Sequence, residues 1–137
     1  MSILRERIPH LMRLILQDHS TRWAAQIPEL TKTQYAVLKV IQEQPSIEQN
    51  RAAALAGTDR STIADMLSRL ENQGLVRRTV AAEDRRRRAL TLTEQGSELL
   101  RATIDRVSEV DHSLLEPLTA DEQETLSRLL RKILDAR

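Results

Sequence analysis

The sequence predicts a mainly α-helical fold with a single β-hairpin, and three observations lead to that prediction. Aromatic residues are almost absent: the chain has Trp23, Tyr35 and no phenylalanine, so its core must be built from aliphatic side chains and methionine. Only three glycines interrupt the 137 residues, which favours helices. Residues 77–92 carry six arginines and two acidic residues, a local net charge of +4 on a chain whose total is +1. Strand-like residues flank this charged segment at 75–80 and 89–92, as in a hairpin with a charged tip.

The first predicted helix runs from about residue 3 to residue 23 and is apolar around most of its circumference. A surface helix needs only one apolar stripe, so this helix is expected to be buried on more than one side. Pro9 marks either a kink or a later start, because proline is tolerated in the first turn of a helix but not in its interior. The apolar residues are Ile3, Leu4, Ile8, Leu11, Met12, Leu14, Ile15 and Leu16.

Three shorter helices follow, each with a start signal and a stop signal. The start signals are capping boxes at Thr31–Gln34 and Ser46–Gln49 and the capping residue Asp59, and the stop signals are Pro45, Gly57 and Gly74. The third of these helices covers residues 60–72. Its expected buried stripe consists of Ile63, Met66, Leu67 and Leu70.

Two longer amphipathic helices are predicted after the hairpin. The first begins at Thr93 and is broken by Pro117, and the second begins at a third capping box, Thr119–Glu122. Apolar residues recur in both at three- and four-residue steps, which is the helical period. They are Leu99, Leu100, Ile104, Val107, Val110, Leu114 and Leu115 in the first helix, and Leu126, Leu129, Leu130, Ile133 and Leu134 in the second.

Two short helices joined by a glycine-containing turn and followed by a hairpin predict a winged helix-turn-helix. The outward face of residues 60–72 carries short polar groups followed by a long cation, which lets a helix approach base edges in the major groove. Its N-terminal amides favour a nearby phosphate. A helix face that is merely solvated has the same composition, but the adjoining arginine-rich hairpin favours DNA binding. The candidate contacts on this helix are Arg60, Ser61, Thr62, Asp65, Ser68 and Arg69.

The hairpin tip adds a second set of candidate DNA contacts. Arg86, two residues after Asp84, is predicted to enter a minor groove, where narrow A·T tracts attract guanidinium groups. Asp84 is expected to orient a neighbouring guanidinium through a bidentate pair. Alternation along a strand splits consecutive arginines between two faces, so some of them contact phosphate or only water. The remaining candidates are Arg77, Arg78, Arg85, Arg87 and Arg88.

Four segments resemble the MarR family of transcriptional regulators. The string Leu30–Leu38 resembles the second-helix signature of that family, and Asp59–Ile63 and Leu70–Arg78 resemble its reading helix and the strand after it. Asp84–Gly96 resembles the family's wing and the start of the next helix. The resemblance covers nearly the whole chain.

Membership of that family would imply a homodimer that binds a pseudopalindromic operator in double-stranded DNA, usually as a repressor relieved by a small-molecule effector. It would also divide this chain into dimerisation helices at residues 1–30 and 93–137 and a winged helix-turn-helix region at residues 31–92. The first helix, which is apolar around most of its circumference, fits that division, as do the apolar stripes of the two C-terminal helices. A finer resemblance, to the HosA-like branch, rests on residues 19–23, 30–37 and 45–49, and implies small hydroxylated aromatic acids as the effector class.

An effector pocket is predicted near the two aromatic residues. Met12, Leu16, His19 and Trp23 are spaced four, three and four residues apart and share one helix face. The hypothesis is that an aromatic carboxylate, or its thioester, stacks near Trp23 and Tyr35 while Arg22 or His19 pairs with its charge. The alternative is that both aromatics are core residues and that His19 and Arg22 are solvated. The candidate effector contacts are Met12, Leu16, His19, Arg22, Trp23 and Tyr35.

Composition and missing motifs narrow the remaining function classes. The absence of cysteine excludes disulfides, thiol switches and zinc fingers. No apolar run reaches the length of a membrane helix, and the N-terminus lacks the apolar core of a secretion signal, so a cytoplasmic protein is expected. No motif indicates a metal, a cofactor or an enzyme. The competing functions are an architectural DNA-binding protein without effector response and an interaction module whose basic hairpin binds an acidic partner.

Overall fold

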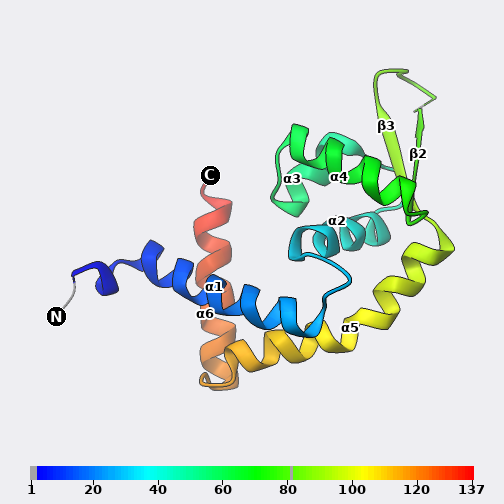
Figure 1. Ribbon diagram of the computed structural model, residues 1–137. Coiled ribbons are helices and arrows are strands. Elements are labelled where there is room, and N and C mark those ends of the chain that lie inside the picture. The colour runs from blue at the N-terminus through cyan, green and yellow to red at the C-terminus, as the bar shows by residue number, and fades with distance from the viewer. Residues whose placement is uncertain (1–2, 81) are drawn as a thin grey trace.

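The computed structural model describes residues 3–80 and 82–137, and over these residues the fold is mainly helical with one small antiparallel sheet (Figure 1). This confirms the winged helix-turn-helix predicted from the sequence. The elements in chain order are the 3-10 turn η1 (Ile3–Glu6), α1 (Ile8–Gln26), α2 (Lys32–Glu43), β1 (Ile47–Glu48), α3 (Gln49–Ala56), α4 (Arg60–Asn72), β2 (Val76–Val80), β3 (Arg88–Leu92), α5 (Glu94–Leu115) and α6 (Ala120–Asp135).

Side-chain caps fix the start of most helices at the predicted positions. The Thr31 hydroxyl accepts a hydrogen bond from the Gln34 amide at 3.0 Å, while the Gln34 side chain accepts one from the Thr31 amide at 2.9 Å. The same reciprocal pair forms between Thr119 and Glu122 at the start of α6. Each cap satisfies amides that the first helical turn cannot bond internally. In α1, Pro9 lies within the first turn, so it marks the later start and not a kink.

The predicted capping box at Ser46–Gln49 is wrong. Ile47 and Glu48 instead pair with Leu90 and Ala89 of β3 and form the third strand of the sheet, whose order is β1-β3-β2. Ser46 has a φ of 67°, and its amide donates to the Leu90 carbonyl at 2.9 Å. The cap of α3 is the Glu48 carboxylate, which accepts from the Arg51 amide at 3.2 Å.

Most of the core lies within the three-helix and sheet region, residues 31–92, which we call the head, and the core continues through Trp23, Ile27 and Leu30 and through Leu100, Val107 and Val110 of α5. Leu38, Ile63, Leu67, Leu70 and Leu90 are completely buried there. Met66, which the sequence placed in the same stripe, is only half-buried. Burial of α4 through one narrow stripe leaves its other face in solvent.

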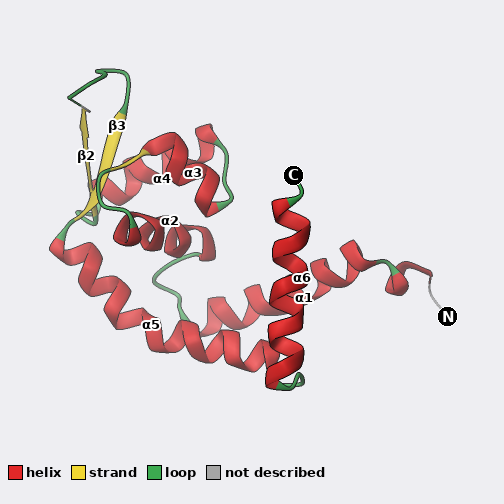
Figure 2. Cartoon of the chain, turned by 180° about the vertical axis from the view of Figure 1, so that it is seen from behind, coloured by secondary structure: helices red, strands yellow, loops and turns green. Residues whose placement is uncertain are grey.

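The two ends of the chain lie apart from the head. α5 leads away from the sheet and packs beside α1, and both views show α6 and the first half of α1 standing clear of the head (Figures 1 and 2). No residue of α6 is buried. Large apolar side chains are exposed on both: Ile8, Leu11, Met12, Leu14, Ile15 and Leu16 on α1, and Leu126, Leu129, Leu130, Ile133 and Leu134 on α6. No helix in the described part of the chain combines the length and apolarity needed to cross a bilayer.

Candidate nucleic-acid interface

The outward face of α4 is exposed as the sequence predicted. The six candidate residues on it are all solvent-exposed: Arg60, Ser61, Thr62, Asp65, Ser68 and Arg69. The helix is started by Asp59, whose carboxylate accepts a hydrogen bond from the Thr62 amide at 2.7 Å. Gly57 supplies the left-handed residue, at φ 74°, that ends α3 and turns the chain into this cap.

The same carboxylate also engages the two hydroxyls at the start of α4. Ser61 Oγ donates to Asp59 Oδ1 at 3.1 Å, and Thr62 Oγ1 donates to Asp59 Oδ2 at 2.9 Å. The Thr62 amide, followed by these hydroxyls, lowers the pKa of Asp59. While they donate to Asp59, the hydroxyls have only lone pairs to offer, so they suit donor groups such as base amines and not phosphate oxygens. The sequence did not predict that Ser61 and Thr62 would bind the capping carboxylate as well as face the candidate DNA surface.

The tip of the hairpin is held from within by Asp84. Its carboxylate accepts from the Arg86 amide at 2.9 Å, and its carbonyl accepts from the Arg87 amide at 3.0 Å, which is a tight turn started by aspartate. The predicted bidentate pair with one guanidinium is not formed. Asp84 instead lies 3.5 Å from Arg86 Nε and 3.9 Å from Arg87 Nε, and 93% of the Arg86 side chain is exposed.

Strand alternation does not separate the four consecutive arginines. Arg85, Arg86 and Arg87 lie in the turn, and β3 begins only at Arg88. The Arg88 guanidinium folds back and donates to the Arg85 carbonyl at 2.8 Å. The four arginines still differ in role, as expected. The reason is that Arg88 holds the turn through its hydrogen bond, while Arg85, Arg86 and Arg87 project from the turn.

Arg78 and Ser68 are occupied by protein partners. Arg78 donates to the Glu71 carboxylate through Nε at 3.3 Å and Nη2 at 3.2 Å, and to Ser68 Oγ at 3.2 Å. Only 24% of the Arg78 side chain is exposed. These bonds join β2 to the last turns of α4. Neighbouring Arg77 points to solvent, as a phosphate-contacting residue would.

Of the six predicted effector contacts, three form one aromatic stack. Trp23 meets Tyr35 edge-on with ring centroids 5.4 Å apart, and His19 lies 6.0 Å from Trp23. His19 Nε2 is 2.8 Å from Asp111 Oδ1, and the indole of Trp23 donates to the Leu30 carbonyl at 2.7 Å. Burial, and secondarily the negative charges of Asp111 and Glu43, raises the pKa of Tyr35.

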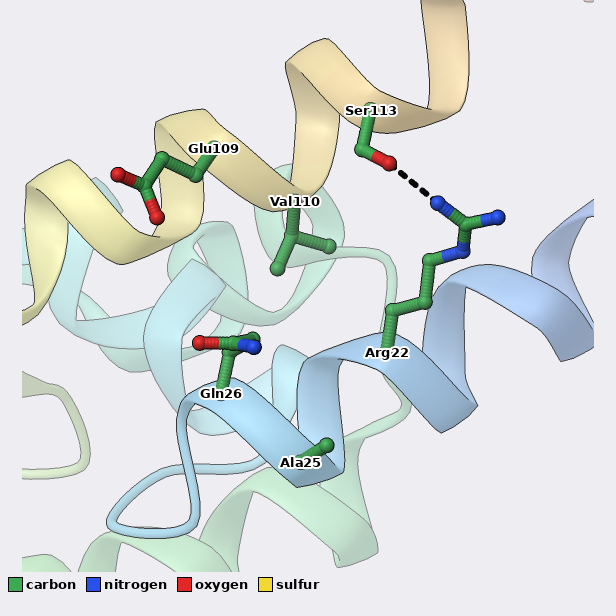
Figure 3. A pocket seen from close by; sticks show the side chains of 6 residues that line it. All are labelled: Arg22, Ala25, Gln26, Glu109, Val110 and Ser113. Atoms are coloured by element: carbon green, nitrogen blue, oxygen red, sulfur yellow. Dashed lines mark hydrogen bonds between the residues drawn. The ribbon is translucent and has the colours of Figure 1, made fainter.

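The other three predicted contacts lie in two separate hollows. Arg22 lines one of about 370 Å³ between α1 and α5, where its guanidinium donates to Ser113 (Figure 3). The Arg22 guanidinium also pairs with Asp18 at 2.9 Å. Met12 and Leu16 line the other, an open region of about 680 Å³ whose lining residues all belong to α1 and include Arg13. Sequence reasoning missed Arg13, which has no ion-pair partner among residues 3–80 and 82–137. The only signal in the sequence was that Arg13 directly follows Met12, a predicted effector contact.

Known proteins are similar to this chain in sequence and in architecture. The model of the MarR family matches residues 30–87. The transcriptional regulator HosA of Escherichia coli is 42% identical over 132 residues, which are 96% of this chain and 98% of that protein. This chain belongs to the MarR family. It is therefore a DNA-binding transcriptional regulator, and the predicted likeness to HosA is confirmed.

Two solved members of the family are similar over almost the whole chain. The PcaV regulator of Streptomyces coelicolor, in complex with its natural ligand, has a TM-score of 0.92 at 35% identity and covers 99% of this chain and 97% of its own. BpsR of Bordetella bronchiseptica, whose structure concerns regulation of DNA binding by 6-hydroxynicotinic acid, has a TM-score of 0.91 at 27% identity and covers 96% of each chain. Both are regulators that respond to a small molecule or are bound to one.

Proposed function

We propose that this regulator binds a pseudopalindromic operator as a homodimer, represses transcription there, and is released by a small aromatic acid or its thioester. The observation that carries the DNA-binding part is the exposed arginine turn beside the exposed face of α4. Both surfaces belong to one rigid head, so they meet the duplex together. Catalysis is not part of the proposed function, because the relatives are transcriptional regulators.

The apolar surface of the chain ends supports the homodimer. α1 and α6 together expose rows of leucine and isoleucine that a soluble monomer would not leave in water. A twofold arrangement through these helices buries them and presents two heads. Half-site centres are then about 10 base pairs apart, one turn of the duplex.

The roles of the candidate DNA contacts divide according to their partners in the free protein. We assign the major groove to Arg60, Asp65 and Arg69, with Ser61 and Thr62 accepting from base donors. Arg86 enters the flanking minor groove, because its exposed guanidinium suits the negative potential there. Arg77, Arg85 and Arg87 contact phosphate, while Asp84, Arg88, Arg78 and Ser68 hold the wing in place.

The effector part of the proposal rests on the α1 hollow. Met12 and Leu16 supply apolar contacts, and the guanidinium of Arg13 can pair with a carboxylate, whereas Arg22 and His19 already have partners. This face of α1 also lies in the proposed dimer interface, so the partner protomer closes the site. The His19–Trp23–Tyr35 stack extends from the next turns of the same helix. BpsR, whose DNA binding is regulated by 6-hydroxynicotinic acid, supports an aromatic acid as the effector class.

Selection from a random DNA pool, followed by salt-dependent binding measurements, tests the DNA-binding part. A palindromic sequence should be retained, and Arg86→Ala should weaken binding to it about tenfold and lower the slope of log affinity against log salt by about one. Arg128→Ala, which removes an arginine from α6, is the matched control and should change neither. A selected pool without sequence preference, or an unchanged slope for Arg86→Ala, contradicts the assignment.

An architectural DNA-binding protein without effector response is the second candidate. It is favoured by the burial of Trp23 and by the protein partners of His19 and Arg22. Trp23 is the single tryptophan, so its fluorescence reports on the stack directly. Release of the selected operator by hydroxylated aromatic acids, with a fluorescence change lost in Arg13→Gln, supports the effector. No response to any member of the panel supports the architectural role.

A further inference from the structure

The head is attached to the helical ends by two short connections. The second connection, at Thr93, is packed tightly. The Thr93 hydroxyl donates to the Gly74 carbonyl at 2.6 Å, and a Cβ on Gly96 would lie 2.2 Å from the Leu75 carbonyl oxygen. The start of α5 is therefore held closely against the sheet, and α2 also packs on α5, so the first connection is a further attachment between the head and the helical ends.

One arginine of α5 forms hydrogen bonds at the first connection, residues 27–31 between α1 and α2. Arg106 Nη1 donates to the Gln26 carbonyl and to Glu29 Oε1, both at 2.8 Å, and Nη2 donates to Glu29 Oε2. The two side chains are 34% and 38% exposed. The hydrogen bonds from Arg106 are the main reason that the pKa of Glu29 falls from 4.5 to about 2, so the pair is charged throughout the neutral range.

The opposite side of the same connection is fixed by α1. The indole of Trp23 donates to the Leu30 carbonyl at 2.7 Å, and Ile27 and Leu30 are buried in the core. The connection is thus held from two directions, through Gln26 and Glu29 by α5 and through Leu30 by α1. The Trp23 bond is buried, whereas the Arg106 bonds lie at the partly exposed surface.

We propose that Arg106 and Glu29 are positioning residues, which set the angle between the head and the helical ends and thereby the operator spacing that a dimer accepts. A guanidinium bound to a carboxylate through two parallel hydrogen bonds fixes orientation as well as distance. The pair joins the connection that enters α2 to α5, so a change in the angle between α2 and α5 has to stretch or break its hydrogen bonds. Neither residue is among the proposed DNA or effector contacts. The inference rests on the proposed function, because spacing has meaning only for a dimer on a two-part site.

Operators with altered spacing test this role. Binding is compared on the selected operator and on the same operator with one base pair inserted between the half-sites. We expect the insertion to weaken wild-type binding at least tenfold but Arg106→Gln and Glu29→Gln only about twofold, so the variants should differ from the wild type by about fivefold, the lower end of the usual range of coupling between sites. Arg106→Lys keeps the charge without the planar fork and should lie between them. Arg101→Gln, an exposed arginine on the same helix, should behave as the wild type.

A distance measurement in the absence of DNA tests the positioning role of Arg106 and Glu29. The chain has no cysteine, so Asn50→Cys on α3 and Ser108→Cys on α5 can carry spin labels at two exposed positions. With labelled chains diluted in unlabelled protein, Arg106→Gln should broaden or shift the distance distribution. An unchanged distribution, or an insertion penalty equal to that of the wild type, overturns the inference. Failure of the wild type to select any operator, with a broadened distribution, instead overturns the proposed function alone.

Discussion

The head and the helical ends are built from the same aliphatic residues but use them differently. In the head, leucines and isoleucines such as Leu38, Ile63 and Leu67 are completely buried by their own chain. In α6 no residue is buried, and Leu130 and Ile133 face solvent. The head therefore has a complete core within one chain, whereas the ends have only half of one. Apolar periodicity alone does not distinguish the two cases, because both show the same three- and four-residue steps.

A charge placed in the exposed apolar row of α6 should have the largest effect, because this row has no partner within the described part of the chain. Ile133→Asp should leave the head folded but prevent pairing through the ends, because an unpaired carboxylate cannot be buried there. Operator affinity should fall about a hundredfold or more, since two linked heads gain that much from effective concentration. Sedimentation and gel-shift measurements give the two readouts.

Lys132→Glu, on the polar side of the same helix, is the control for that substitution. It should keep both the assembly state and the affinity. A wild-type chain that sediments as a monomer at micromolar concentration, or an Ile133→Asp chain that still pairs, would show that the exposed rows are not an interface.

A smaller effect is expected inside the head, where Arg78 ties β2 to α4. Arg78→Ala and Glu71→Ala should each weaken operator binding about fivefold to tenfold, and the double variant should be no worse than either, because they share one interaction. The salt slope should not change, since Arg78 does not reach phosphate. Arg77→Ala, one residue away and exposed, should lower the slope by about one.

Titrating salt for all four variants separates the two roles. A lower salt slope for Arg78→Ala would mean that Arg78 does contact phosphate.

The smallest effect concerns the junction between the two regions and depends on pH. The folded pKa of Glu29 is about 2, below its ordinary 4.5, so the native state binds fewer protons than the unfolded state between these values. The stabilisation by Glu29 is complete above about pH 5, decreases below that pH, and is lost only as the pH falls through 2. Unfolding of wild type and Glu29→Gln, followed at pH 7, 4 and 2.5, should show a difference that is constant above pH 5 and clearly smaller at pH 2.5. Because the pair is partly exposed, the difference should be modest and decrease with salt. A difference that persists unchanged at pH 2.5 would mean that the carboxylate charge is not its source.

Local signals in the sequence were sufficient to predict most of the fold. Thr31, Asp59, Thr93 and Thr119 each cap the helix that the sequence assigned to them, because a cap depends on residues only three positions apart. The capping box at Ser46 failed because Ile47 and Glu48 pair with β3, more than forty residues away along the chain. No local pattern reveals that partner.

The exposure of the candidate site was predicted from the sequence, but the protein partners of several of its residues were not. The exposed face of α4 and the arginine turn lie where the sequence placed them. The partners that occupy some of these residues come from other elements: Glu71 binds Arg78 across seven positions, and Asp111 binds His19 across ninety-two. Such pairs depend on tertiary packing, so the sequence alone suggested more free charges than the folded protein has.

The aspartate in the hairpin turn has a consequence for how quickly and tightly DNA is bound. Asp84 already satisfies the backbone amide of Arg86, and its carbonyl satisfies that of Arg87, so the turn over residues 84–87 is hydrogen-bonded in the free protein. Ordering a flexible loop at an interface reduces affinity by the conformational entropy that is lost, and a loop shaped in advance avoids most of that loss. What remains is the ordering of the Arg86 side chain itself, so Asp84→Ala should slow association even though its carboxylate repels the phosphates that the arginines attract.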